Sequence, residues 1–132
     1  MKKRFEPIEG RNAEIISDVM SCPEVADLSE DVKFKVRLCV EEVEENILCY
    51  SGTAWVEVSV ARENNVLTIG FRDQGVKFDP LDKEEPDINA PVEERAVGGL
   101  GIFICKQFMD EITYRYRSGT NELTMVLKLC GK

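Results

Sequence analysis

The most informative absence in this chain of 132 residues is histidine, which does not occur at all. Without histidine the chain itself supplies no Ser-His-Asp triad, no His-ligated metal site and no phosphohistidine. It also lacks any run of about 18 apolar residues, so we expect no membrane span. No apolar stretch follows the basic residues at its start, as a signal peptide would require. We therefore expect a cytoplasmic protein.

Cysteine pairs at metal-binding or redox spacing are missing too. The cysteines are odd in number and widely spaced, with no C-x-x-C pair among them: Cys22, Cys39, Cys49, Cys105 and Cys130. We expect buried or semi-buried thiols in a reducing compartment.

Basic residues are also few, since 17 Lys and Arg against 25 Asp and Glu leave a net charge of −8. This charge repels phosphate backbones and anionic lipids, so we expect neither nucleic acid nor a membrane as a partner.

Length and hydrophobic periodicity predict a single α+β domain. A chain of 132 residues with 43% hydrophobic residues has room for one ordinary core. Apolar residues recur at helical spacing over 12–20, 31–50 and 99–109. They alternate with polar residues on both sides of a turn in 54–72 and again in 112–129, which predicts two hairpins. In the second hairpin we expect Ser118 to Asn121 to turn the chain into a strand over 123–129. This order favours a two-layer α/β sandwich, an antiparallel or mixed sheet covered on one face by helices.

The segment 78–97 is predicted to be a surface loop. It holds three prolines and many charged side chains, so it is too polar to pack and too rich in proline to be helical throughout. Loops of this length in a compact domain are often mobile lids over a site, and plain disorder is the alternative.

Glu42 and Asn46 are the first candidates for chemistry. They lie four residues apart on the predicted helix and share one face, at the edge of its apolar stripe. A glutamate can act as a general base, and the side-chain oxygen of asparagine is a donor that Mg²⁺ accepts beside phosphate oxygens. The alternative is a solvated acidic face, because Glu41, Glu44 and Glu45 belong to the same helix.

Two glycine-containing motifs follow. At the end of a predicted strand, Asp73 can accept a hydrogen bond from an exocyclic amine such as that of adenine, and Gly75 lets the backbone approach a planar ring. An ordinary turn is the alternative.

The stretch 98–101, G-G-L-G, opens a predicted helix, whose free N–H groups and positive dipole end favour phosphate. Helix packing alone is the alternative there.

The order of these motifs resembles the ATP-binding fold of the GHKL superfamily, the Bergerat fold of gyrase, Hsp90, histidine kinases and MutL. That order is E-x-x-x-N on a helix, D-x-G at a strand end, a long loop, and G-x-G opening a helix. The stretches V-E-E-V-E-E-N-I-L-C-Y, D-Q-G-V-K-F-D-P, G-G-L-G-I-F-I-C-K-Q-F-M-D-E-I and N-E-L-T-M-V-L closely resemble the bacterial anti-sigma factor serine/threonine kinases of the RsbW and SpoIIAB type. The resemblance covers about residues 10–130.

This resemblance implies ATP and Mg²⁺ as cofactors and a role for individual residues. Glu42 would be the general base, and Asp73 would bind the adenine amine with support from Thr124 on the adjacent strand. The residues implied to hold the nucleotide or its metal are Asn46, as the Mg²⁺ ligand, Asp73, Gly75, Arg95, Gly99, Leu100, Gly101 and Thr124. The chain departs from the family pattern at Lys77, which replaces the second glycine of the D-x-G-x-G box.

The resemblance further implies an ATP-dependent protein serine/threonine kinase that acts as an anti-sigma regulatory factor in a partner-switching pathway. Its partners would be an antagonist with a STAS domain, which it phosphorylates, and a sigma factor or other signalling protein; a homodimer is possible. The alternative is a nucleotide-gated binding protein that sequesters a partner and has little kinase activity. The catalytic domain of a histidine kinase is disfavoured, because no phosphoacceptor histidine is present.

Overall fold

A computed structural model describes residues 1–6, 11–50, 52–77, 79, 81 and 99–129 of the chain. Their elements, in chain order, are β1 (Lys2–Phe5), α1 (Arg11–Ser21), α2 (Pro23–Ala26), α3 (Glu30–Tyr50), β2 (Val56–Glu63), β3 (Val66–Asp73), α4 (Gly99–Phe108), β4 (Glu111–Arg117) and β5 (Thr120–Lys128). Apart from Asp79 and Leu81, the predicted loop 78–97 lies outside the described residues.

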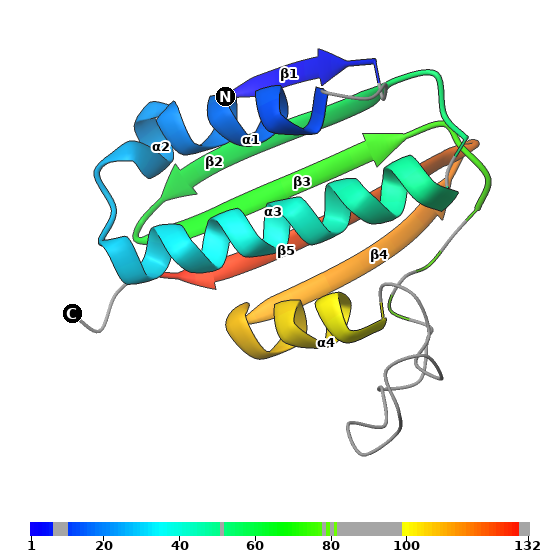
Figure 1. The fold of residues 1–132 in the computed structure, drawn as a ribbon. Coiled ribbons are helices and arrows are strands. Elements are labelled where there is room, and N and C mark those ends of the chain that lie inside the picture. Colours follow the sequence, from blue (N-terminus) through cyan, green and yellow to red (C-terminus); the bar gives the residue numbers. More distant parts are fainter. Residues whose placement is uncertain (7–10, 51, 78, 80, 82–98, 130–132) are drawn as a thin grey trace.

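The strands form one sheet in the order β1-β2-β3-β5-β4, and every neighbouring pair is antiparallel. Helices α1, α3 and α4 all lie on the same face of this sheet (Figure 1). The predicted α+β fold with helices on one face is therefore confirmed. Strand β1 and the short helix α2 were not predicted, because four residues each carry too little periodicity to be recognised.

Two tight turns set the register of the sheet. Between β2 and β3, Asn64 and Asn65 have φ angles of 53° and 65°, and residues with positive φ at both turn positions match the twist of a hairpin. Between β4 and β5 the turn residues are Ser118 and Gly119. Because this turn is so short, β5 begins at Thr120, before the strand start expected from the sequence.

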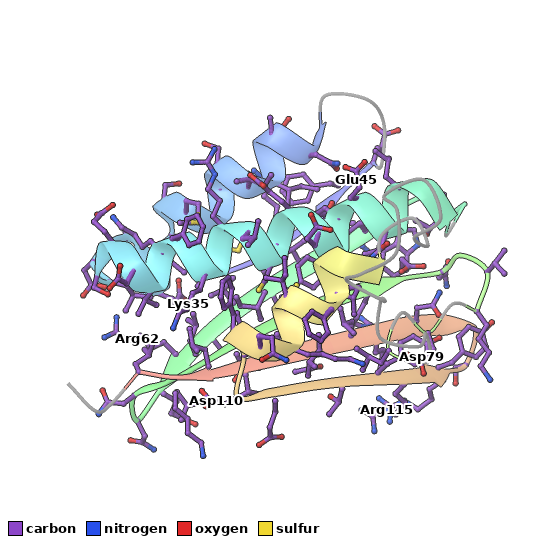
Figure 2. The ribbon with its side chains drawn as sticks, turned by 60° about the horizontal axis from the view of Figure 1, so that its bottom comes forward. Lys35, Glu45, Arg62, Asp79, Asp110 and Arg115 are labelled. Atoms are coloured by element: carbon purple, nitrogen blue, oxygen red, sulfur yellow. The ribbon has the colours of Figure 1, made fainter. Side chains whose placement is uncertain are left out.

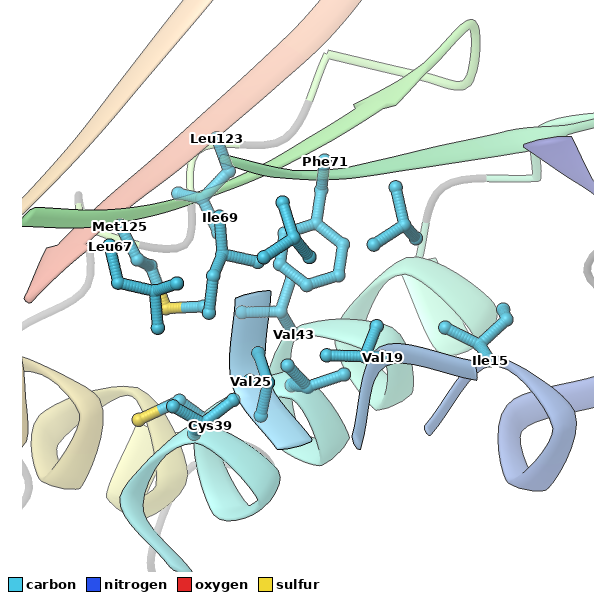
Figure 3. Packing of buried hydrophobic residues seen from close by; sticks show 14 of the residues in the cluster. Ile15, Val19, Val25, Cys39, Val43, Leu67, Ile69, Phe71, Leu123 and Met125 are labelled. Atoms are coloured by element: carbon cyan, nitrogen blue, oxygen red, sulfur yellow. The ribbon is translucent and has the colours of Figure 1, made fainter. Parts of the chain in front are cut away.

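The core fills the space between the sheet and the helices (Figure 3). Its fully buried side chains come from the inner faces of both layers: Ile15, Val19, Val25, Val36, Cys39, Val40, Val56, Val58, Leu67, Ile69, Phe71 and Met125. The thiols of Cys22, Cys39 and Cys105 are free and buried, as predicted. In the part of the chain that the structure describes, no helix is both long and apolar enough to cross a membrane.

Candidate functional site

Helix α3 places Glu42 against the start of α4. A Cβ atom added at Gly101 would overlap the Glu42 carboxylate and lie 2.8 Å from Glu42 Cγ, so only glycine permits this contact. Farther along the same two helices, the Cys105 thiol approaches the carbonyl oxygen of Cys39 at 4.0 Å. Helices α3 and α4 thus lie side by side (Figure 2). Glu42, the glutamate of E-x-x-x-N, contacts Gly101 of the G-x-G motif.

The surroundings of Glu42 raise the pKa of its carboxyl group, which favours a role as a base. Burial raises the pKa of its carboxyl group, and the nearby carboxylates of Glu45 and Glu41 raise it further. Both causes disfavour the charged form of an acid. A carboxylate whose pKa lies closer to neutrality accepts a proton more readily than an ordinary surface glutamate.

Asn46 is buried with 5% of its surface exposed, and its Nδ2 has no hydrogen-bond partner among the described residues. Buried amide groups without partners are rare, so this one is suited to a ligand. The described residues contain no cluster of three or more Cys, Asp or Glu that holds a metal ion. The free Nδ2 is a hydrogen-bond donor, so it suits a phosphate oxygen or a metal-bound water, whereas the side-chain oxygen of the same amide is the atom type that Mg²⁺ accepts.

Asp73 is held rigidly at the end of β3, where 4% of its surface is exposed. Its Oδ1 accepts hydrogen bonds from the Gly75 amide at 2.8 Å and from Asn121 Nδ2 at 3.0 Å. Asn121 Nδ2 also donates to the Val76 carbonyl at 2.9 Å, and the Tyr114 hydroxyl donates to Asn121 Oδ1. Asn121 thus ties the carboxylate to the D-x-G turn, a role that was not predicted.

Thr124 does not lie beside Asp73, in contrast to the prediction. In β5 the buried Leu123 and Met125 face the core, so Thr124 faces the opposite side of the sheet. There it lies across from Gly70 in the register and lines a hollow on the side away from the helices. The residue across from Asp73 is Asn121.

Glu44 belongs to the site as well, although from the sequence it was considered only as part of the alternative, a solvated acidic face. Only 2% of its surface is exposed, and its Oε1 has no hydrogen-bond partner among the described residues. Burial, together with the nearby charge of Asp73, raises its pKa to about 8. The sequence contains a sign of this, because Glu44 lies four residues after Val40 and three before Ile47, both in the apolar stripe.

Of the remaining residues singled out from the sequence, all but Arg95 lie within the part of the chain that the structure describes. Gly99 and Leu100 form the first turn of α4, as the motif implied, whereas Arg95 lies outside the described residues. Lys77, at the second glycine position of the box, is exposed, and its Nζ lies 5.7 Å from the centre of the Tyr116 ring. The lysine side chain is therefore directed toward β4.

We expect Asn121→Ala to weaken ATP binding about tenfold or more and Thr124→Val to change it less than twofold. The first substitution removes a hydrogen bond to a buried carboxylate, typically worth about 1.5–3 kcal/mol. The second changes a side chain on the other face of the sheet. Isothermal titration with ATP measures both affinities, and a larger loss in Thr124→Val would contradict this assignment.

Comparison with known proteins identifies the family and the fold. Residues 8–127 match the family described as "Histidine kinase-like ATPase domain". The serine/threonine-protein kinase BtrW of Bordetella bronchiseptica is 25% identical over 101 residues, which cover 74% of this chain and 71% of that protein. The solved structure of the Acinetobacter baumannii histidine kinase AdeS superposes with a TM-score of 0.57 at 11% identity, covering 98% of this chain and 68% of that one. The last likeness concerns the fold alone.

Proposed function

Because the chain belongs to the family of histidine kinase-like ATPase domains, we propose that it is an ATP-dependent protein serine/threonine kinase acting as an anti-sigma regulatory factor. The observation that carries this proposal is the packing of Glu42 on Gly101, which puts a base beside the start of α4. The relative named as a serine/threonine-protein kinase supports a hydroxyl acceptor. A family of ATPase domains implies ATP as the nucleotide.

In the proposed reaction Glu42 accepts the proton of a serine or threonine hydroxyl. The hydroxyl oxygen forms a bond to the γ-phosphorus of ATP, and the bond from that phosphorus to the bridging oxygen of ADP breaks. Bound Mg²⁺ would offset the charge on the transferring group, with Asn46 as its protein ligand. The N–H groups at the start of α4 favour phosphate, and Asp73 orients the adenine. Positioning and electrostatics of this kind dominate phosphoryl transfer.

The proposed acceptor is a serine or threonine of an antagonist with a STAS domain, and the proposed second partner is a sigma factor. The family resemblance of the motifs around Glu42, Asp73 and Gly101 supports both. In such a system the two partners compete for one protein, so phosphorylation of the antagonist releases this chain for the sigma factor.

A thermal-shift titration with ATP and ADP, with and without Mg²⁺, tests the nucleotide site. ATP at a hundred times its dissociation constant should stabilise the fold by about 2.7 kcal/mol. Asn46→Ala should keep the melting temperature of the unliganded protein and lose the Mg²⁺-dependent part of the shift. Full Mg²⁺ dependence in this variant would remove Asn46 as the metal ligand.

Transfer of the γ-phosphate to a STAS-domain protein, followed with labelled ATP, tests the kinase reaction itself. Stabilisation by ATP without any transfer would identify a nucleotide-gated binding protein instead. The absence of any shift with either nucleotide would contradict both functions.

A further inference from the structure

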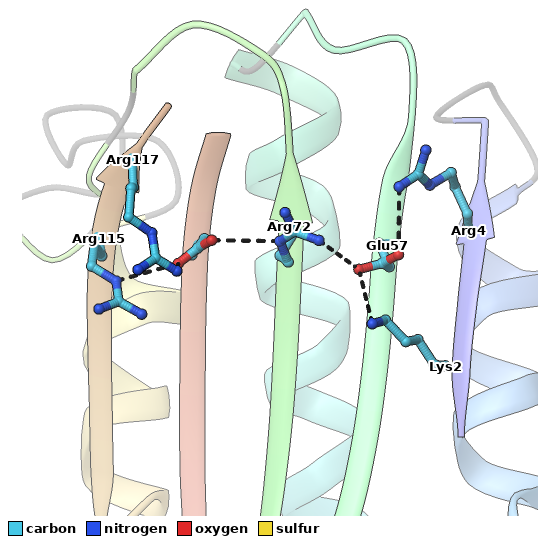
Figure 4. A network of polar contacts seen from close by, with 7 residues as sticks. Lys2, Arg4, Glu57, Arg72, Arg115 and Arg117 are labelled. Carbon is cyan, nitrogen blue, oxygen red and sulfur yellow. Dashed lines mark hydrogen bonds and ion pairs between the residues drawn. The ribbon is translucent and has the colours of Figure 1, made fainter. Parts of the chain in front are cut away.

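The face of the sheet away from the helices carries a row of charged side chains across all five strands (Figure 4). The row, which we call the basic row, consists of Lys2 and Arg4 on β1, Glu57 on β2, Arg72 on β3, Glu122 on β5, and Arg115 and Arg117 on β4. Arg72 joins its two halves, since it pairs with Glu57 at 3.0 Å and with Glu122 at 3.5 Å.

Positive charge dominates the exposed part of the basic row. Five cations and two carboxylates leave a local charge of +3 in a chain whose net charge is −8. The side chains of Glu57 and Glu122 are only 12% and 16% exposed, whereas those of Arg115 and Arg117 are 64% and 61% exposed. The carboxylates therefore orient the guanidinium groups from below, and solvent meets mainly the cations.

The surface around the basic row has the shape and composition of a contact surface. A hollow of about 310 Å³ adjoins it, and Arg72, Arg117 and Glu122 of the basic row are among its lining residues. At the β1 side, the Arg4 guanidinium lies 3.9 Å from the centre of the Trp55 ring. Arginine and aromatic residues are enriched in protein–protein interfaces. None of the described helices covers this face (Figure 1), and Arg115 projects from the sheet away from them (Figure 2).

We propose that the basic row is a docking surface for a partner protein whose surface is rich in aspartate and glutamate. Guanidinium groups held in fixed orientations match separate carboxylates, to which they donate paired hydrogen bonds. A nucleic acid fits less well, because it presents a continuous line of phosphates, whereas the pairs with Glu57 and Glu122 divide the cations into separate clusters. A second copy fits less well too, because it would bring an identical positive face.

This surface lies back to back with the candidate site. Arg72 precedes Asp73 on β3 and Glu122 follows Asn121 on β5, and successive side chains of a strand point to opposite faces. A partner on the basic row therefore leaves the nucleotide face open. The proposal goes beyond the proposed kinase activity and does not depend on it.

The single tryptophan of the chain, Trp55, provides a probe beside the basic row, because the centre of its ring lies 3.9 Å from the Arg4 guanidinium. A synthetic peptide rich in Asp and Glu, titrated without nucleotide, should change the Trp55 emission saturably, with an affinity that falls as salt rises. Arg115→Gln combined with Arg117→Gln should weaken binding at least tenfold. The matched control, Lys33→Gln with Lys35→Gln on α3, removes the same charge elsewhere and should change the affinity less than twofold.

Four outcomes would overturn the proposal. The first is no binding of the peptide, and the second is equal weakening in both double variants, which would show an effect of net charge alone. The third is tighter binding of a single-stranded oligonucleotide of equal charge. The fourth is a dimer in sedimentation experiments that dissociates only in the Arg115 and Arg117 variant, which would place a second copy on this face. Circular dichroism of both variants confirms that they are folded, and the absence of ATP separates these results from the kinase proposal.

Discussion

We expect Glu42→Gln to lower the rate of phosphoryl transfer by about 10²- to 10⁴-fold, the usual contribution of a general base, and to leave ATP binding within about twofold. The amide keeps the size of the side chain and its place against Gly101, but it cannot accept the hydroxyl proton. Single-turnover transfer to a STAS-domain protein and titration with ATP measure the two effects separately.

Glu41→Gln is the matched control, because it removes a neighbouring carboxylate of the same helix. Glu41 pairs with Arg37 at 3.2 Å, one turn earlier on α3, and within the described residues no hydrogen bond or ion pair joins it to α4. Its variant should transfer phosphate at nearly the rate of the original protein. Equal rates in Glu42→Gln and Glu41→Gln would show that Glu42 is not the base.

The second large effect concerns stability and pH. Glu44 has a pKa of about 8 in the folded protein, against about 4.3 in an unfolded chain. It therefore binds its proton more tightly when folded, so the free energy of unfolding falls as pH rises from about 4.5 to about 8 and then levels off. A shift of this size corresponds to at most about 5 kcal/mol, since each pH unit contributes about 1.4 kcal/mol.

Urea unfolding of the metal-free protein at pH 6 and pH 9 measures this effect. Glu44→Gln has a neutral side chain of the same size, so it should unfold at a similar urea concentration at both values. Relative to the original protein, the variant should gain about 3 kcal/mol between pH 6 and pH 9, because only the two pH units below the pKa of about 8 fall in this interval. The comparison cancels the titration of the other carboxylates, and parallel pH dependence in the two proteins would contradict the burial of a protonated Glu44.

The elements that bear the site were largely predictable, because their signals are local. The apolar residues of α3 recur at helical spacing, and the helix predicted over 31–50 is observed from Glu30 to Tyr50. The four-residue spacing of Glu42 and Asn46 places them on one face of any α-helix. Similarly, glycine at the start of α4 was recognised, although its close contact with Glu42 was not.

The residues around Asp73 were less predictable, because the length of the turn between β4 and β5 sets which residue of β5 lies across from Asp73. We expected Ser118 to Asn121 to turn the chain, whereas Ser118 and Gly119 alone do so. Strand β5 therefore begins three residues earlier than expected, at Thr120, and Asn121 lies in the sheet across from Asp73. The same register leaves Thr124 three residues away and on the other face, since side chains alternate along a strand.

The sequence by itself determined the order of the longer elements, the placement of Glu42 and Asn46 on one helix face and the exclusion of histidine chemistry, since periodicity, spacing and composition need no knowledge of the fold. The tertiary structure decided that Asn121 holds Asp73 across 48 residues of chain, that Glu44 is buried and that the basic row gathers on one face. Each of these depends on strand register or on packing between layers, and both arise only when segments far apart in the chain come together.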